Sequence, residues 1–554
     1  RIPPSVPDEP VDIDALAAMD TAADKREVGL SLDLPLGNSV AVHFDGSYRN
    51  TDDLEIPGFA ASDNLRAELL ADADEEEEEG HLDEAEELRE AADIADVLPN
   101  SWTETYSLGT GIAFFSGDSN VGVSIDYFDN TYGVPGLPGI GHAHGEEEGD
   151  EEAGDEEDGE APVSIGMDRF RLAMQGTLDL GDGFLDEVTT RWAYSDYTHT
   201  EFEGDEVGTV FEVEGVEGRI ELAQSRRGGW QGALGMQFSY VDFAALGDEA
   251  FVPPNRTQNV ALFALQEVEL EPVQLEFGAR YEDTEIKVTD GSGAERDFGS
   301  FSAAAGISAA LLENPMDDLR IGLNFSRAER APSAQELFAD GPHIATQVFE
   351  VGNPELGTET SWGVEAYLRG AIGPAQLSAS IYRNWFDSFI FLSETGAVED
   401  GLEEFRFLQQ DADQFGVEAE LSAPLVESTG FALLAEVRGD YVRATLNGGS
   451  PIPRIPPLSL SGALEGQFAH FDARAEVEWF DNQQRVSEHE LATDGFTFVN
   501  FSLAWHPLEG NENLTLIAQV DNLFDVEGRR HASFTKEFVP LAGRNFKLSA
   551  RASF

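Results

Sequence analysis

The sequence predicts an all-β fold, a transmembrane antiparallel β-barrel. Segments in which apolar and polar residues alternate recur along the 554 residues, and a period of two indicates strands with one apolar and one polar face. The polar faces carry Arg and Glu together in mid-strand, which suits the lumen of a barrel. No window reaches the roughly 18 consecutive apolar residues that a membrane-spanning helix needs, whereas barrel strands need only about 9–11 alternating residues.

The last nine residues show the alternation most clearly. Phe546, Leu548, Ala550, Ala552 and Phe554 alternate with Lys547, Ser549, Arg551 and Ser553. A soluble sheet would turn the polar face to water, whereas a membrane barrel turns the apolar face to lipid and the polar face to the lumen. We expect this strand to pair with the first strand and close the wall.

Similar segments occur throughout, for example at 275–281 and 471–479. A set of soluble sandwiches would need a core formed by two sheets within units of about 100 residues. No linker or shift in composition divides the chain into such units. A single barrel therefore explains the even spacing better than tandem sandwiches or a propeller.

The connections between these segments differ in length. Short turns such as those at 312–319 and 506–514 are expected on the periplasmic side, and long polar loops on the outside. Within residues 63–98 the apolar residues fall at helical spacing, which predicts a helical hairpin broken at Gly80. Residues 141–160 hold eleven acidic and no basic side chains, and we expect this His- and acid-rich loop to be disordered.

Composition excludes several classes of function. The net charge of −74, from 107 acidic and 33 basic side chains, makes nucleic acid an unlikely partner, because phosphate binding needs clustered Lys and Arg. Such a chain attracts cations instead. It contains no cysteine, so neither a disulfide nor a thiolate metal site is possible.

Two motifs carry a family resemblance. Residues 330–338 read RAPSAQELF and residues 352–361 read GNPELGTETS, and the ending contains Asn522-Leu523-Phe524-Asp525. The chain thereby resembles TonB-dependent outer-membrane receptors. The resemblance implies a barrel of about 22 strands, a location in the outer membrane of a Gram-negative bacterium, and active uptake of a scarce nutrient without enzymatic activity.

A narrower resemblance is to the zinc-uptake branch of these receptors. It is carried by ELFADGPHIATQVFEVGN at 336–353, by Tyr132 to Gly136 followed by the acidic loop, and by the ending HASFTKEFVPLAGRNFKL. It implies that the transported ligand is Zn²⁺ or another divalent transition metal. No cofactor is expected.

Receptors of this family carry an N-terminal plug with a box that engages TonB. Neither fits before the first barrel strands, which we expect near residues 27–50. We therefore interpret residues 1–26 as a remnant of the plug-to-barrel connection and residues 27–554 as the barrel. The plug is expected to have been removed or to lie on another chain, and the barrel to be a monomer in the lipid of the outer membrane.

Histidines beside carboxylates are the candidate metal ligands, because imidazole suits zinc, copper or nickel. His142 and His144 stand beside the dense acidic run, and a flexible site there would bind weakly and release easily. A solvated loop with two incidental histidines explains them equally well. His343 lies inside the best-matching motif, where the resemblance implies a vestibule ligand, and the alternative is a histidine that packs the loop.

Three further residues belong to the candidate set. His199 and Glu201 have the spacing of one strand face, although a lumen-facing strand pair without metal accounts for them as well. His81 stands at the predicted hairpin break after five glutamates. We exclude His531, because Arg529 and Arg530 make its surroundings positive. The sequence contains no nucleophile elbow or zinc-protease motif, so we expect no catalytic residues.

These inferences predict an importer in which the TonB complex, acting through the plug, opens a path for a metal ion. Three alternatives remain. A siderophore or another metal chelate would be the ligand if the site were basic and aromatic. A passive pore would result if no plug exists. A surface adhesin would have no transport role.

Overall fold

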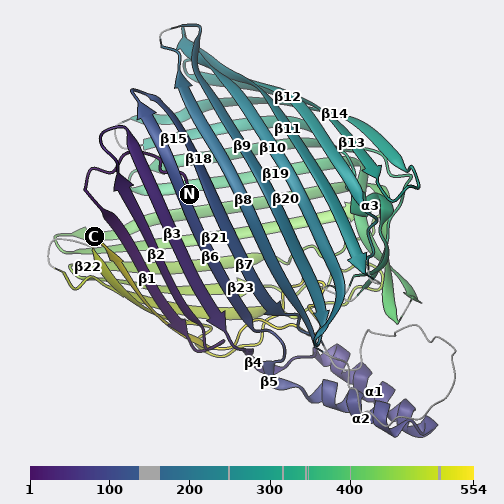
Figure 1. The fold of residues 1–554 in the computed structure, drawn as a ribbon. Helices are drawn as coiled ribbons and strands as arrows, with labels where there is room; N and C mark the ends of the chain where they lie inside the picture. Colours follow the sequence, from purple (N-terminus) through teal and green to yellow (C-terminus); the bar gives the residue numbers. More distant parts are fainter. Residues whose placement is uncertain are drawn as a thin grey trace.

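The computed structural model describes residues 1–554 except for 137–161, 182, 248–249, 315–316, 344–345, 347, 400 and 509–512. The described residues form a closed antiparallel barrel with two helices projecting from one end (Figure 1). The main sheet has 24 strands, of which β16 and β17 belong to a loop, so 22 strands of the described chain form the wall. The predicted fold is confirmed.

The wall strands are β1 (Asp12–Asp20), β2 (Arg26–Pro35), β3 (Val40–Thr51), β6 (Thr103–Ser116), β7 (Ser119–Gly133), β8 (Val163–Asp179), β9 (Leu185–Glu203), β10 (Glu206–Arg227), β11 (Trp230–Gly247), β12 (Asn255–Leu270), β13 (Val273–Val288), β14 (Glu295–Asn314), β15 (Asp317–Arg330), β18 (Glu359–Ile372), β19 (Ala375–Glu399), β20 (Leu402–Ser428), β21 (Phe431–Leu446), β22 (Ser459–Phe468), β23 (Phe471–Phe480), β24 (Phe496–Trp505), β25 (Leu514–Asp521) and β26 (Asn545–Ser553). The loops add β4 (Leu54–Phe59), β5 (Ala95–Leu98), β16 (Asp340–His343), β17 (Val348–Val351), α1 (Asp63–Glu79), α2 (Leu82–Asp93) and α3 (Ala334–Phe338).

The barrel closes between its first and last strands. β1 and β26 are antiparallel, with a register that runs from Asp14 opposite Ser553 to Asp20 opposite Lys547. The terminal strand thus closes the wall as expected. The wall begins at Asp12, however, within the segment 1–26 that the sequence suggested as a connection to a plug. β1 was missed because its apolar residues do not alternate cleanly, and only pairing with both neighbours identifies it as a strand.

The two faces of the wall differ as the alternation predicts. Phe546 and Leu548 are 53% and 55% exposed on the outer face of β26. Between them Lys547 points into the lumen, where its Nζ lies 2.5 Å from Asp521 Oδ2 on β25. Exposed apolar side chains of this size are stable against lipid hydrocarbon and unfavourable in water.

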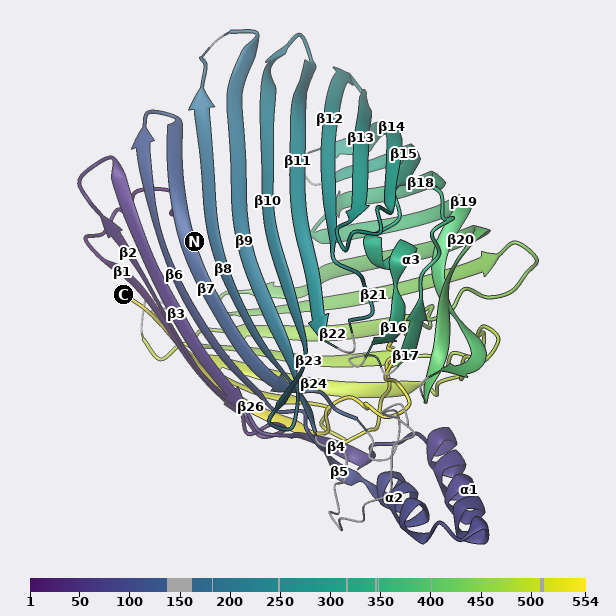
Figure 2. The same ribbon diagram turned by 45° about the vertical axis from the view of Figure 1, so that its right-hand side comes forward.

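The two ends of the barrel also differ. The C-terminus, the start of β1 and short connections such as 228–229 and 373–374 lie at one end, and the connections 52–102, 331–358 and 522–544 lie at the other, which we call the long-loop end. Figure 2 shows α3, β16 and β17 gathered at this end beside β19 and β20. In outer-membrane barrels short turns face the periplasm and long loops face outward.

The predicted helical hairpin is confirmed at the long-loop end. α1 and α2 are separated by Gly80, whose φ of 100° is a left-handed conformation that glycine adopts without strain. Leu69 and Ala92 are buried where the helices meet the barrel loops. The pair β4 and β5 connects the hairpin to the wall. No helix in the described part of the chain is long and apolar enough to cross a membrane.

The first residues lie inside the barrel. The Arg1 amino group is 3.8 Å from Asp45 on the lumen face of β3. A Cβ atom added to Gly111 of β6 would lie only 2.0 Å from the Arg1 carbonyl oxygen, so the glycine leaves room for the chain. The N-terminal segment therefore runs along the inner surface of the wall.

We predict that Leu548→Arg destabilises the barrel by about 2–4 kcal/mol, because the charge would enter lipid near the middle of the membrane. Ser549→Arg, one residue on and facing the lumen, is the matched control and should cost much less. Guanidinium unfolding of the full-length protein in lipid vesicles measures both. Equal destabilisation by the two variants would contradict the assignment of faces.

Candidate functional site

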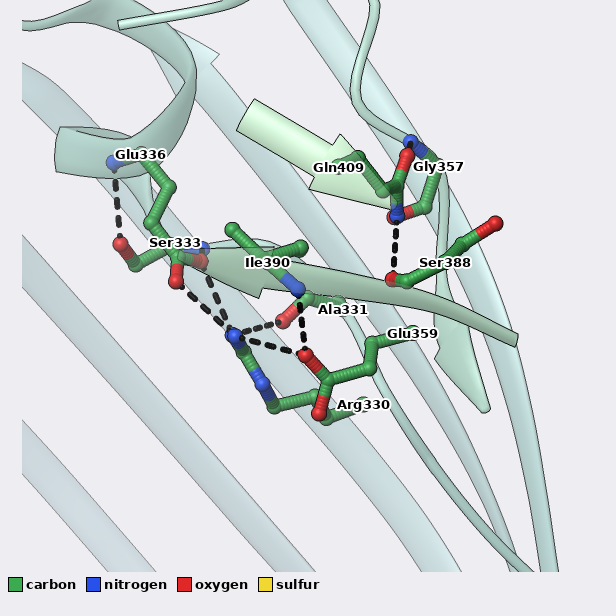
Figure 3. A network of polar contacts seen from close by, with 9 residues as sticks. All are labelled: Arg330, Ala331, Ser333, Glu336, Gly357, Glu359, Ser388, Ile390 and Gln409. Carbon is green, nitrogen blue, oxygen red and sulfur yellow. Dashed lines mark hydrogen bonds and ion pairs between the residues drawn. The ribbon is translucent and has the colours of Figure 1, made fainter. Parts of the chain in front are cut away.

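A network of polar contacts fixes the base of loop 331–358 (Figure 3). Arg330, at the end of β15, donates to both carboxylate oxygens of Glu336 at 2.9 and 3.0 Å, and to Glu359 at 3.3 Å. Ser333 caps α3 by accepting from the Glu336 N–H, and the Glu336 carboxylate accepts from the Ser333 N–H. The capping box and the bidentate ion pair fix the start of the loop, and the contact between Arg330 and Glu359 joins its two ends.

The same network reaches the β19–β20 hairpin. Glu359 accepts from the N–H of Ile390 at 2.8 Å. The Gln409 amide accepts from the Gly357 N–H at 2.9 Å and donates to the carbonyl oxygens of Gly357 and Ser388 at 2.9 and 3.0 Å (Figure 3). The loop therefore has a fixed position on the wall, and the residues that it carries are positioned with it.

His343 lies on this loop, on β16. Its Nδ1 is 2.8 Å from Glu350 Oε1, and Glu350, only 2% exposed, accepts a second hydrogen bond from Gln335 Nε2 at 2.7 Å. An ionised carboxylate can only accept, so Nδ1 carries a proton; in the neutral imidazole Nε2 then keeps its lone pair, and no hydrogen-bond partner for it occurs among the described residues. A buried carboxylate behind a histidine is the usual arrangement behind metal-binding histidines.

His199 and Glu201 lie on β9. The His199 Nδ1 is 2.9 Å from the Tyr197 hydroxyl, and its Nε2 is 3.8 Å from Glu201 Oε1. Glu201 is 6% exposed, so its carboxylate is largely removed from water. These two candidates therefore form a close pair.

An aromatic chain connects this pair to His343. His199 packs on Phe211 with ring centroids 4.3 Å apart, Phe211 lies 6.4 Å from Phe251, and Phe251 stacks on His343 at 4.4 Å. The structure thus brings candidates separated by more than a hundred residues in sequence around one apolar cluster at the long-loop end. Apolar surroundings strengthen electrostatic interactions with a bound ion.

The other candidates lie elsewhere. His81 stands at the far end of the α1–α2 hairpin, with its Nδ1 2.7 Å from Glu76 and 3.8 Å from Glu84. The predicted loop 141–160 with His142 and His144 lies outside the described residues.

A cavity of about 260 Å³ at the long-loop end was not predicted from the sequence. We call it the loop chamber. Its lining comes from α1, from the β16–β17 and β19–β20 hairpins, and from the loops 447–458, 481–495 and 522–544. Val348, which lines the chamber, pairs with His343 across the β16–β17 hairpin, so the chamber adjoins that histidine. No motif or spacing signals this cavity, because six separate segments form it.

Carboxylates with shifted pKa values line the loop chamber. The β19–β20 hairpin pairs with β18 and β21 only up to about Asp387 and Ala412, so its tip stands beyond the wall. There burial, followed by repulsion from Glu403, raises the pKa of Glu394 to about 7. His489 in the same lining acts in the opposite direction. No sequence motif or spacing singles out Glu394 or His489.

Glu490 organises the opposite side of the chamber. Its carboxylate lies 3.1 Å from the His531 ring, 3.6 Å from Lys536 Nζ, and accepts from the N–H groups of Ser487 and Arg454. Burial acts to raise the pKa of Glu490, but these partners outweigh it and lower the pKa to about 2. His531 is 3% exposed, and its ring lies between the Glu490 carboxylate and the Thr493 hydroxyl, so its surroundings include a negative charge that the neighbouring arginines in the sequence did not indicate.

Comparison with known proteins identifies the family. The family model described as TonB dependent receptor-like, β-barrel, matches residues 101–523, which is more than half of the chain. The chain belongs to this family. It is therefore the barrel of an outer-membrane receptor of a Gram-negative bacterium, from a family of transporters rather than enzymes, and its long-loop end faces outward.

Solved structures share the fold of this receptor. A copper transporter, OprC, has a TM-score of 0.75 at 16% identity over 98% of this chain and 80% of its own. The FrpB iron transporter from Neisseria meningitidis has a TM-score of 0.72 at 12% identity, over 99% and 83%. The siderophore receptor PirA from Pseudomonas aeruginosa has a TM-score of 0.65 at 14% identity, over 99% and 81%. At these identities the likeness establishes the fold alone.

We predict that Glu490→Gln lowers the free energy of local opening of the loop 481–495 by about 2–4 kcal/mol, because the substitution leaves buried cationic partners unpaired. The folded pKa of about 2 lies below the ordinary value of 4.5, so this stabilisation is complete above pH 4.5 and is lost as the pH falls toward 2. Hydrogen exchange of peptides from 481–495, corrected for intrinsic rates, measures it. Glu488→Gln, at an exposed neighbour, is the control, and equal exchange in both variants would contradict the prediction.

Proposed function

We propose that this receptor imports a divalent transition metal ion, with zinc as the first choice. The observation that carries the proposal is the orientation of His343, whose Nδ1–H is held by the buried Glu350 carboxylate so that Nε2 is free. Zinc binds neutral imidazole nitrogen, and a carboxylate behind the ring increases the basicity of that ligand.

His199 and Glu201 supply a second pair of ligands in this proposal. Zinc sites hold about four ligands. Phe211 and Phe251 lie between this pair and His343, so in the described structure the pair and His343 are two separate positions at which an ion would bind with further ligands. Because Phe211 and Phe251 pack between the two histidines, an ion bound at one histidine would affect the position of the other. We propose that the plug supplies the remaining ligands and that the TonB complex, acting through the plug, opens the path.

Charge distinguishes a free metal ion from a siderophore or another metal chelate as the transported ligand. Two of the solved structures with this fold bear the names of a copper and an iron transporter, and a third is a siderophore receptor. The aromatic cluster would suit a chelate, but an anionic chelate needs cationic partners. Here the buried groups beside the candidate histidines are the carboxylates Glu201 and Glu350, which favour a free cation.

We propose that acidic loops collect the ion before it reaches the mouth. His81 on the helical hairpin, and His142 and His144 in the acidic segment 141–160, would contribute weak, exchangeable ligands. A net charge of −74 raises the local concentration of cations around such loops.

We predict that His343→Ala in the full-length receptor lowers zinc uptake at limiting metal by about tenfold or more, because the site loses a ligand. Uptake of radioactive zinc and growth on limiting zinc measure the effect, in cells with and without TonB. Glu350→Gln should give a smaller loss in the same direction. The control is His470→Ala, at a short turn on the other end of the barrel.

An unchanged zinc response in His343→Ala would remove this residue from the site. Loss of growth on a ferric chelate, with normal zinc uptake, would support the siderophore alternative. Uptake that does not depend on TonB would support a passive pore.

We predict that deletion of residues 142–160 lowers zinc uptake at limiting metal and leaves uptake at saturating metal unchanged. The reason is that a collecting loop matters only when the supply of metal limits transport. Initial uptake rates over a range of zinc concentrations measure this. Equal rates at the lowest concentration would show that the segment plays no part in collection.

A further inference from the structure

The tip of the helical hairpin brings three metal-ligating side chains together. Glu76 comes from the last turn of α1, His81 from the connection and Glu84 from the first turn of α2. One ligand atom from each lies within 4.8 Å of the others. The left-handed Gly80 makes this possible, because it turns the chain so that the N–H groups of Gly80 and His81 both donate to the Glu76 carbonyl oxygen at 2.9 Å.

The two helices hold this arrangement in place. Ala73 of α1 and Ala85 of α2 are fully buried between the helices. Arg89 of α2 donates to Asp74 at 3.1 Å and to Glu77 at 2.5 Å, both on α1. These contacts fix the two helices relative to each other close to the tip. Binding of a metal ion therefore requires little further loss of conformational freedom in the backbone that carries the ligands.

The electrostatics of the tip are unfavourable without a cation. α1 ends in five consecutive glutamates, 75–79, and has no basic residue in its last turn. The C-terminus of a helix carries a partial negative charge, so carboxylates there are destabilising and cations are favoured.

We propose that Glu76, His81 and Glu84 form a binding site for a divalent transition metal ion at the tip of the hairpin. Carboxylates alone would favour Ca²⁺ or Mg²⁺, and the imidazole directs the preference to ions such as Zn²⁺, Co²⁺ or Cu²⁺. The His81 Nδ1 faces both carboxylates, so an ion bound between them would take the place of a proton on Nδ1. Water completes the coordination, which keeps binding weak and exchange fast.

The place of this site in the fold suggests what it does. Leu65 and Glu68, near the start of α1, line the loop chamber. The site begins at Glu76, in the last turn of the same helix, about 12–17 Å from these two residues at 1.5 Å per residue. It would hold ions outside the barrel and release them toward the chamber. This role as a collector rests on the proposed import of metal, whereas the binding itself does not.

The test exploits the absence of cysteine from the chain. Glu87→Cys in the full-length receptor, labelled with a maleimide fluorophore, places a single dye on α2, three residues beyond Glu84 and about 5 Å along the helix. Cu²⁺ or Co²⁺ bound at the tip quenches the dye over short distances, so ions bound elsewhere contribute little. The quenching should saturate, be reversed by a chelator, and be displaced by Zn²⁺.

Matched variants decide the outcome. His81→Ala and Glu84→Gln should each weaken the quenching by about tenfold or more, since each removes one ligand. Glu78→Gln removes the same charge from the same glutamate run and should leave it nearly unchanged. Quenching that is equal in His81→Ala and Glu78→Gln, or absent in the parent protein, overturns the proposal.

The result is independent of the proposed function. Saturable quenching in a receptor that does not take up zinc would leave the site standing and remove the import proposal. Normal zinc uptake without quenching would remove the hairpin site and leave the import proposal standing. Circular dichroism of the variants confirms that the hairpin remains helical.

Discussion

Closure of the sheet is the constraint on which the rest of this receptor depends. In lipid no water can satisfy the backbone of an edge strand, so every wall strand must have two neighbours. The pairing of β1 with β26 meets this requirement and brings both ends of the described wall to the short-turn end. Closure also fixes which face of every strand meets lipid. All long connections then gather at the other end, where residues distant in sequence become neighbours.

The position of His343 at the long-loop end depends on how loop 331–358 is attached to the rigid wall. Arg330, Glu336 and Glu359 hold loop 331–358 at both ends, and Gln409 ties it to the β19–β20 hairpin. This gives the family motif a physical meaning, because its charged residues form the clamp that positions the loop. The clamp sets the position of β16, and Glu350 sets the orientation of the His343 ring.

The sequence predicted the parts of the structure that depend on local pattern. Alternation predicted the strands and the lipid-facing residues, and helical spacing with Gly80 predicted the hairpin. It did not predict β1, because the pattern there is weak and closure alone identifies it. Nor did it predict the loop chamber or the meeting of His199 with His343 around Phe211 and Phe251. These contacts join segments of the chain that share no spacing, so only the closed barrel brings them together.

The acidic residues have two different roles, which their partners reveal. In the wall, several carboxylates stand two residues from an arginine on the same strand face, as in Arg219–Glu221 at 2.7 Å and Arg474–Glu476 at 3.0 Å. Such pairs neutralise each other and contribute little field. The segment 63–98 instead has sixteen acidic and two basic side chains, so most of its charge has no counterion in the segment. This segment therefore places an unbalanced negative charge at the long-loop end, and such a charge attracts cations from the medium.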